Sequence, residues 1–317
     1  MRKLLSLVVL FALLLPSAQA ATMRTTLISA MSRIGEAFND FPSSHPNYAA
    51  VMFLAEREIV KGYPNGSFQP NAAVNRAELV KMVVGMMEGD VTQSGGGNCF
   101  PDVRGEWFAP YVCYAKERGW IGGYPDGTFR PANSVSRVEA MKIVLNVMIE
   151  ESLWPTPTDL EKGMQMPKDA DMKQWYSSYL LFSVAKELLD GEHVALAEDG
   201  SYTYQPGAPM TRKEVAEHIF RTYLYMIERV EIAELLGETM CFQIAHASED
   251  EETARNKWIN QFLADQNYTE AEVDQLNTKY STDEVVDALA QDVRESSCGD
   301  ASTVDMTRWE SFKRFGM

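Results

Sequence analysis

Apolar residues recur at helical spacing in pairs of segments along the chain. In residues 107–119 they fall on one face and the pattern stops at Gly119, and a second apolar stripe runs over 138–148. Apolar positions three and four residues apart predict one face of an α-helix, and a glycine just after them is typical of a helix end. The same pair of stripes occurs over 48–59 and 79–87. The pattern therefore predicts a mainly α chain built from helix–loop–helix units.

The loop between the paired stripes is a repeat. It reads GYPNGSFQP up to Pro70 and GYPDGTFRP up to Pro131, and the two copies keep one constant offset. A fixed period of this kind indicates a repeat protein. Within each loop Pro-Asn-Gly or Pro-Asp-Gly favours a turn, because proline presets φ and glycine accepts a positive φ. An altered third copy, with Tyr204 in place of the phenylalanine, ends at Pro206.

The repeats set the expected domain boundaries. A glycine-rich run separates the first two copies, a proline-rich stretch separates the second from the third, and an acidic region with helical patterns follows the third. The expected segments are a signal peptide over 1–20, an N-terminal helix or linker over 21–37, repeat 1 over 38–90, repeat 2 over 99–150, a linker over 151–166, repeat 3 over 167–227 and a small acidic helical domain over 228–317.

Each loop proline is followed at a constant spacing by an arginine, namely Arg76, Arg137 and Arg212. A cap-forming residue precedes each arginine and a glutamate follows it, as in the capping box at the start of a helix. A helix start offers unpaired backbone N–H groups and partial positive charge, and an arginine added there makes a site for a carboxylate or phosphate. The alternative is that each arginine only pairs with a neighbouring acid, such as the aspartate of the next Phe-x-Asp element.

The first residues resemble an export signal. Arg2 and Lys3 precede an apolar run over 4–15, and the small-residue triplet 18–20 predicts cleavage before Ala21. The alternative is a retained membrane anchor, but the run is shorter than the ~20 residues that a spanning helix needs. We expect a secreted protein with no transmembrane segment in its mature chain.

Charge and cysteines narrow the range of functions. The formal net charge of −16 argues against nucleic acid as a partner, because nucleic-acid binding needs a basic surface. Four cysteines allow three pairings, and the local one, Cys99–Cys113 with Cys241–Cys298, crosses no domain boundary. The four histidines are scattered and no Cys-x-x-Cys occurs, so we expect no metal and no cofactor.

The combination of Phe-x-Asp, Trp, GYPDGTF-x-P and Ser/Thr-Arg-x-Glu, spread over residues 38–227, resembles the S-layer homology (SLH) family of cell-wall anchoring modules. The resemblance implies three repeats in a pseudo-threefold, three-pronged spindle around a central helical bundle. It also implies non-covalent binding of a pyruvylated secondary cell-wall polysaccharide in grooves between the repeats, at the cell surface.

The resemblance also assigns roles to particular residues. The arginines would grip the pyruvate carboxylate, the aspartates would bond sugar hydroxyls or order the groove, the tryptophans would form an apolar wall, and the glycines would let the backbone approach the ligand. These residues are Arg76, Arg137, Arg212, Asp40, Asp102, Asp169, Trp107, Trp175, Gly62 and Gly123. Repeat 1 has Pro46 where the tryptophan is expected, and repeat 3 has an altered, longer loop. We therefore expect the groove centred on Arg137 to be the most competent.

Two other functions stay open on the sequence. The chain could be an anchored enzyme with its catalytic part in 228–317, although no Gly-x-Ser-x-Gly or His-Glu-x-x-His motif occurs there. Alternatively, that acidic region could dock another envelope protein, with the repeats as its tether. The function we expect first is a non-enzymatic one, binding to the cell wall.

Overall fold

The computed structural model describes residues 38–92, 98–150, 166–171, 173–186, 188–189, 195–196 and 201–245, together with residues 271, 273 and 290. By backbone contacts the chain divides into two compact units. The repeat unit comprises 31–150 and 156–223, and the other unit comprises 1–30, 151–155 and 224–317. The expected signal peptide, the segment 21–37, nearly all of the linker 151–166 and most of the expected C-terminal domain lie outside the described residues.

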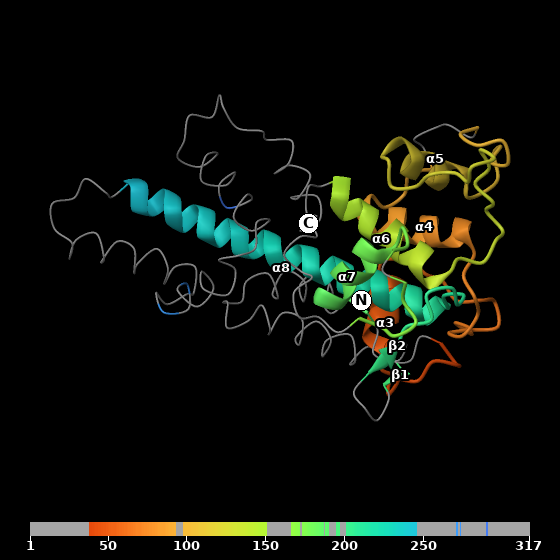
Figure 1. The fold of residues 1–317 in the computed structure, drawn as a ribbon, viewed down its shortest axis with the longest axis horizontal. Coiled ribbons are helices and arrows are strands. Elements are labelled where there is room, and N and C mark those ends of the chain that lie inside the picture. The colour runs from red at the N-terminus through yellow and green to blue at the C-terminus, as the bar shows by residue number, and fades with distance from the viewer. Residues whose placement is uncertain are drawn as a thin grey trace. The chain divides into compact units, whose positions relative to one another are not determined.

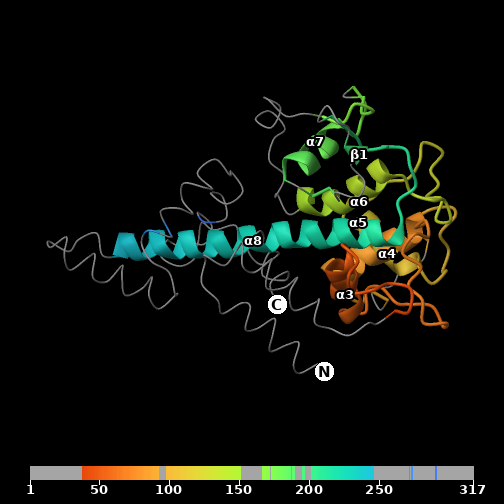
Figure 2. The same ribbon diagram turned by 90° about the horizontal axis from the view of Figure 1, so that it is seen from below.

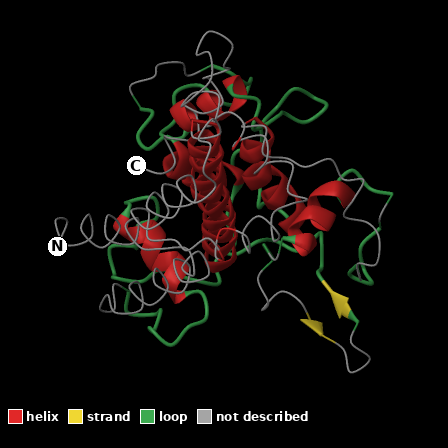
Figure 3. Ribbon diagram, turned by 90° about the vertical axis from the view of Figure 1, so that its left-hand side faces the viewer, coloured by secondary structure: helices red, strands yellow, loops and turns green. Residues whose placement is uncertain are grey.

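The described residues form helices and one small pair of strands (Figure 3). The helices are α3 (Tyr48–Glu56), α4 (Arg76–Met87), α5 (Ala109–Glu117), α6 (Arg137–Glu150), α7 (Ser177–Ala185) and α8 (Arg212–Ala245). The strands β1 (Ala195–Leu196) and β2 (Tyr202–Thr203) pair antiparallel. The prediction of a mainly α chain is confirmed. Within the part of the chain that the structure describes, no helix combines the length and the apolar character needed to cross a membrane.

Each repeat contributes two helices, and the last of them extends beyond its repeat. Repeat 1 holds α3 and α4, repeat 2 holds α5 and α6, and repeat 3 holds α7 and the start of α8. The expected boundary between 227 and 228 falls inside α8, which continues to Ala245. The division between the two units falls within the same helix, between Tyr223 and Leu224.

Side-chain caps fix where the second helix of a repeat begins. At α4 the Asn75 side chain accepts from the N–H of Glu78, and the Glu78 side chain accepts from the N–H of Asn75, both at 2.9 Å. At α6 Ser136 and Glu139 exchange the corresponding bonds, at 3.4 and 3.0 Å. The predicted capping boxes are therefore formed at these two helices. Because proline and turn residues come just before the caps, each helix begins abruptly after its loop.

Three backbone hydrogen bonds join the repeats in a closed ring. The N–H of Val74 donates to Met210 O at 2.9 Å, that of Met210 to Val135 O at 2.9 Å, and that of Val135 to Val74 O at 3.1 Å. All three residues are buried. Each lies just ahead of the second helix of its repeat, so the ring relates the three repeats by a pseudo-threefold arrangement.

Helix packing follows the same cyclic order. The first helix of repeat 2, α5, packs on α4 of repeat 1, and α7 of repeat 3 packs on α6 of repeat 2 (Figure 1, Figure 2). Repeat 1 completes the cycle, because Phe53 of α3 contacts Phe220 and Tyr223 of α8, with ring centroids 4.9 and 5.2 Å away. Every repeat therefore has contacts with both of the others.

A disulfide fastens the start of repeat 2 to α5. It joins Cys99 to Cys113, the local pair that the sequence predicts. The second predicted pair, Cys241–Cys298, lies outside the residues whose side chains the structure describes.

Candidate functional site

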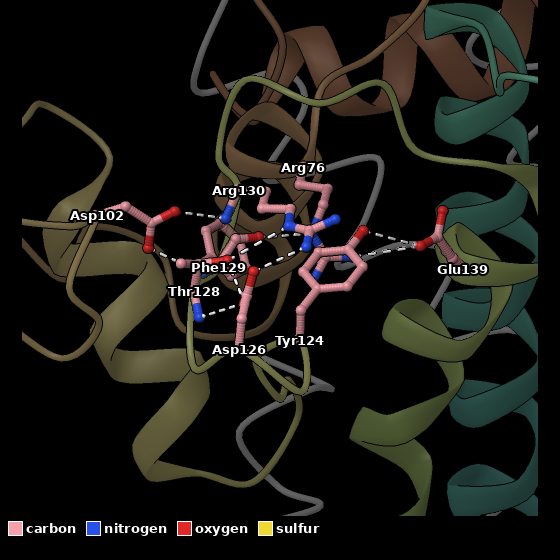
Figure 4. A network of polar contacts seen from close by, with 8 residues as sticks. All are labelled: Arg76, Asp102, Tyr124, Asp126, Thr128, Phe129, Arg130 and Glu139. Carbon is pink, nitrogen blue, oxygen red and sulfur yellow. Dashed lines mark hydrogen bonds and ion pairs between the residues drawn. The ribbon is translucent and has the colours of Figure 1, made fainter.

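An aspartate in each repeat holds that repeat's own loop. In repeat 2 the Asp102 carboxylate accepts hydrogen bonds from the N–H groups of Phe129 and Arg130, at 2.8 and 2.7 Å (Figure 4). Asp40 and Asp169 accept from the corresponding N–H groups of repeats 1 and 3, at 2.6 to 2.8 Å. In the structure these carboxylates order the loops, and their contact with sugar hydroxyls stays a prediction.

The second residue of each clamped pair has a left-handed backbone. Its φ is 55° at Gln69, 57° at Arg130 and 56° at Gln205. This conformation costs a non-glycine residue roughly 1–2 kcal/mol. A charged carboxylate that accepts two N–H bonds offsets that cost. The loop therefore turns sharply after its aromatic residue.

The glycines Gly62 and Gly123 make room for a phenylalanine ring. A Cβ on Gly123 would lie 2.9 Å from Phe100 Cε1 and 3.0 Å from Thr128 O, and a Cβ on Gly62 would lie 2.7 Å from Phe38 Cε1. These distances are too short for a real Cβ, so packing of the Phe-x-Asp element alone requires glycine at both positions. Gly123 also lines the groove described below, and a role of either glycine toward a ligand stays a prediction.

The expectation of unpaired N–H groups at the helix starts is wrong. At α4 the N–H groups of Arg76 and Ala77 donate to Asn133 O and Pro131 O of repeat 2, at 3.0 and 3.1 Å. The next N–H, that of Glu78, is taken by the capping box. Carbonyl groups of a neighbouring repeat occupy the corresponding N–H groups of α6 and α8 as well. Any anion at these helix starts must therefore be held by side chains.

The three arginines reach from one repeat to the next. Arg76 Nε donates to Phe129 O of repeat 2 at 3.0 Å, Arg137 Nη1 donates to Tyr204 O of repeat 3 at 2.8 Å, and Arg212 Nε donates to Phe68 O of repeat 1 at 2.9 Å. The acceptor is each time the carbonyl of the loop's aromatic residue. The arginines thus close the same cycle as the backbone ring.

The acid beside two of these arginines is the capping glutamate of the next repeat. Arg137 pairs with Glu214 at 3.2 Å, and Arg76 lies 4.0 Å from Glu139. The aspartate of the Phe-x-Asp element, which the sequence offered as a partner, instead bonds the loop N–H groups. The predicted ion pair therefore forms at these two arginines, but its acid is a capping glutamate rather than the aspartate.

A hollow of about 180 Å³ lies beside the loop of repeat 2, where residues of all three repeats meet. Repeat 1 contributes Arg76, repeat 2 contributes its Gly-Tyr segment and one face of α6, and repeat 3 contributes Trp175. We call this hollow the Arg76 groove. Its lining residues are Arg76, Trp120, Ile121, Gly122, Gly123, Tyr124, Glu139, Lys142, Ile143, Asn146 and Trp175.

An exposed aromatic ring and a lysine face each other in the Arg76 groove. Trp175 is 52% exposed, and Lys142 Nζ lies 5.3 Å from the centre of its ring. Trp107 is 61% exposed and lies outside this groove, edge-on against Phe108. The aromatic wall and the arginine of one groove therefore come from different repeats, and a wall role for Trp107 stays a prediction.

The structure groups the arginines and the loops differently from the sequence, and whether the Arg137 groove is the most competent stays a prediction. The most family-like loop, that of repeat 2, is served by Arg76, whereas Arg137 bonds the altered loop of repeat 3. The wall of the Arg76 groove is Trp175 of repeat 3. Spacing within one repeat could not reveal this, because the grouping depends on which repeat lies next in the cycle.

Tyr124 links the charged groups of the groove (Figure 4). Its Oη donates to Glu139 Oε1 at 3.1 Å, and the guanidinium carbons of Arg76 and Arg130 lie 4.9 and 4.1 Å from its ring centre. Burial and the Glu139 charge raise the pKa of Tyr124, against the opposite effect of Arg76. Tyr124 therefore stays a neutral hydrogen-bond donor beside two cations, and such contacts favour a fixed guanidinium position.

Among the groove residues, sequence reasoning did not assign Tyr124, Lys142 or Asn146 to a site. A signal for two of them was present, because Tyr63 and Lys81 occupy the corresponding positions of repeat 1 at the same offset. Asn146 could be recognised only from the fold, where its side chain donates to Trp120 O at 2.7 Å and accepts from Tyr179 Oη at 3.0 Å.

The fold and this groove define a class of protein in which helix–loop–helix repeats close a ring and share grooves that present cations beside an aromatic wall. Residues 37–80 and 100–141 match the family model of the S-layer homology domain. These two segments are therefore S-layer homology repeats. The third repeat lies outside the matched residues and has the same aspartate clamp and cross-repeat arginine.

Surface proteins of several bacteria are similar to this chain. It is 32% identical over 110 residues to a cellulosome-anchoring protein of Acetivibrio thermocellus, covering 34% of this chain and 25% of that protein. It is 27% identical over 212 residues to the surface-layer 125 kDa protein of Lysinibacillus sphaericus, covering 65% and 16%. It is 26% identical over 125 residues to the S-layer protein sap of Bacillus anthracis, covering 39% and 15%. The chain thus spans a quarter or less of these relatives, and the shared domain indicates a secreted, cell-wall-associated surface protein.

Proposed function

We propose that this chain anchors non-covalently to the cell wall by binding an acidic secondary cell-wall polysaccharide, and that the group it recognises is a pyruvyl ketal. The observation that carries the proposal is the placement of Arg76, Lys142 and Trp175 around one groove. Two cations fit a carboxylate, and an exposed indole ring fits the apolar face of a sugar.

The groove residues have different roles in binding such a ligand. Arg76 is held by Phe129 O and by the ring of Tyr124, so its charge is positioned before any ligand arrives. Lys142 is a less constrained cation beside Trp175. Asn146 adds an amide at the groove wall, and its hydrogen bonds to Trp120 and Tyr179 fix its orientation. Such preorganisation favours affinity because less freedom is lost on binding.

A non-enzymatic role is supported by the relatives, which are named as anchoring and surface-layer proteins. Release of reducing sugar or peptide from purified walls by the chain would favour the anchored-enzyme alternative instead.

The test is co-sedimentation of residues 21–317 with purified cell-wall sacculi, before and after removal of the pyruvyl ketal. The variants Trp175→Ala and Lys142→Ala are better probes than Arg76→Ala. Arg76 is buried, and its removal leaves Phe129 O without its donor, which costs roughly 1–3 kcal/mol of stability. Lys173→Ala is the control, because Lys173 is exposed and lies outside the groove lining.

The expected result is loss of binding on ketal removal. Trp175→Ala and Lys142→Ala each weaken binding to untreated sacculi about tenfold, as expected when one stacked ring or one charge-assisted contact is lost. Lys173→Ala binds as the unaltered chain does. Binding that is indifferent to the ketal contradicts the pyruvyl part of the proposal, and binding that is indifferent to both groove variants contradicts the groove itself.

A further inference from the structure

The turn in the loop of repeat 1 carries a reactive pair of residues. Asn65 is the one asparagine of the sequence that is followed by a glycine, Gly66. Both residues are exposed, and Gly66 has a φ of 80°. A Cβ on Gly66 would lie 3.2 Å from Asn39 Nδ2, so both the backbone and the space of the turn favour glycine. Without a Cβ, the Gly66 nitrogen is open to the side chain that precedes it.

The Asn65 amide is polarised by the residue that follows the glycine. Asn65 Oδ1 accepts from Ser67 N at 3.1 Å and from Ser67 Oγ at 2.7 Å. Two donors on one carbonyl oxygen withdraw electron density from its carbon, and they stabilise the oxyanion that forms when a nucleophile adds there. The amide carbon Cγ of Asn65 is therefore activated toward a nucleophile.

The nucleophile is the backbone nitrogen of Gly66. Its N–H donates to Tyr63 O at 2.9 Å inside the turn, and both residues are exposed. Such a bond opens locally without unfolding of the repeat unit. Once the bond is open, the N–H can lose its proton to hydroxide, and the nitrogen can reach the amide carbon of the residue before it.

The equivalent turn of repeat 2 offers an internal comparison. It reads Asp126-Gly127, followed by Thr128. The Asp126 carboxylate accepts from Thr128 Oγ1 and N at 2.7 and 3.0 Å, and from Arg130 Nη2 at 2.8 Å. These bonds from Thr128 and Arg130 hold the pKa of Asp126 well below its ordinary value. An ionised carboxylate is a poor electrophile, so this turn does not undergo the reaction that the neutral amide of repeat 1 permits.

We infer that Asn65 is a site of spontaneous deamidation, and that the modification alters the contact between repeats 1 and 3. The Gly66 nitrogen, having given its proton to hydroxide, forms a bond to Asn65 Cγ, and the carbonyl electron pair moves to Oδ1. The pair returns as the bond from Cγ to Nδ2 breaks, and Nδ2 takes a proton from water and leaves as ammonia. Water then opens the resulting succinimide ring at either carbonyl. One opening gives aspartate at position 65, and the other gives isoaspartate, in which the main chain runs through the side chain.

The two products have different effects on the loop of repeat 1. Aspartate keeps an acceptor for Ser67, as the carboxylate in the equivalent turn of repeat 2 does for its threonine. Isoaspartate lengthens the backbone inside the turn, where Tyr63 N donates to Ser67 O at 2.8 Å. The next residue, Phe68, presents the carbonyl that accepts from Arg212 Nε of repeat 3. Isoaspartate therefore disturbs the loop at the point where it contacts repeat 3.

The experiment incubates the mature chain, residues 21–317, at mildly alkaline pH and follows every asparagine by proteolytic digestion and mass spectrometry. Chromatography separates the aspartate and isoaspartate peptides, which have the same mass. We expect Asn65 to convert about tenfold faster than any other asparagine of the chain, with a rate that rises in proportion to hydroxide. Asn65→Gln is the matched control, because its longer side chain would have to close a larger ring, and position 65 should stay unmodified over the same time.

Two further variants test the chemistry of the turn. Ser67→Ala removes one donor from Oδ1 and should slow the conversion about threefold to tenfold, the rate equivalent of one hydrogen bond. Asp126→Asn places an amide in the turn of repeat 2, beside the same two kinds of donor from Thr128, and should convert at a rate within about threefold of Asn65. After incubation, the isoaspartate fraction of the unaltered chain should unfold at a lower urea concentration than the aspartate fraction.

Retention of Asn65 while other asparagines convert overturns the inference, and so does a rate that Ser67→Ala leaves unchanged. Equal unfolding midpoints of the two fractions overturn its second part, the altered contact between repeats. Mass and unfolding are measured without sacculi, so these outcomes are independent of whether the proposed function holds.

Discussion

Glu139 joins the start of a helix to the candidate binding site. Its carboxylate accepts from the N–H and Oγ of Ser136, at 3.0 and 2.8 Å, and from Tyr124 Oη at 3.1 Å. It also lies 4.0 Å from the Arg76 guanidinium. Burial acts to raise the pKa of Glu139, but the bonds from Ser136 and Tyr124 and the charge of Arg76 outweigh burial and lower it. At neutral pH a carboxylate is therefore already beside the arginine that a ligand needs.

The substitution Glu139→Gln tests this competition. Glutamine still forms a capping box, so the helix start is kept while the negative charge is removed. Affinity for sacculi at pH 7 should rise about threefold to tenfold. Because the folded pKa of Glu139 is lowered, its contribution to stability is complete above the ordinary value of 4.5 and is lost as pH falls through the lowered value. The decrease in free energy of unfolding between pH 7 and pH 3 should therefore be smaller in Glu139→Gln, as measured by urea denaturation.

The matched control for this prediction is Glu214→Gln. Glu214 pairs with Arg137 at 3.2 Å, and that arginine serves a different loop. Binding in the Arg76 groove should be unaffected by this change. Weaker sacculus binding in Glu139→Gln would show that the carboxylate assists the ligand rather than competing with it.

At the scale of elements, a disulfide and a pair of hydrogen bonds hold one segment of repeat 2 in place. The disulfide ties Cys99 to Cys113 of α5, and Asp102, just beyond Cys99, ties the same segment to the loop at Phe129 and Arg130. The loop in turn presents the carbonyl that holds Arg76. The position of the arginine therefore depends on the Cys99 segment.

Replacing both cysteines, Cys99→Ser with Cys113→Ser, should lower the free energy of unfolding by about 3 kcal/mol, the chain-entropy value for a closed loop of this length. Sacculus binding should weaken as well, because the Asp102 segment loses its tie to α5. Thermal unfolding followed by circular dichroism measures the first effect and co-sedimentation the second. An unchanged unfolding midpoint would mean that packing of Phe100 against Phe129, at 5.4 Å between ring centres, is sufficient to hold the segment.

The elements that local chemistry determines could be read from the sequence, and the contacts between repeats could not. The stripes at 48–59 and 79–87 predict helices close to α3 and α4, and Asn75 with Glu78 predicts the cap, because a helix start is decided within a few residues. The partner of Arg76 lies in the following repeat, so no spacing inside repeat 1 indicates it. The occupied N–H groups at the helix starts were missed for the same reason.

At the scale of the whole repeat unit, no repeat is complete without the others. The Arg76 groove draws residues from all three repeats. The backbone ring through Val74, Val135 and Met210 passes through each repeat once. Breaking any one of its bonds opens the ring between two repeats. The binding site and the folded repeat unit therefore both require the closed ring of three repeats.

Native-state hydrogen exchange followed by NMR tests this closure. The N–H groups of Val74, Val135 and Met210 should exchange with one common free energy, equal to that for global unfolding of the repeat unit, because local opening cannot expose any of them alone. The N–H of Gly66, bonded to Tyr63 O at 2.9 Å within an exposed loop, should exchange through local opening at a lower free energy. A lower value at Met210 than at Val74 and Val135 would show that repeat 3 opens by itself. The Arg76 groove would then lose Trp175 in the opened state, and sacculus binding should weaken under the mild denaturant that populates it.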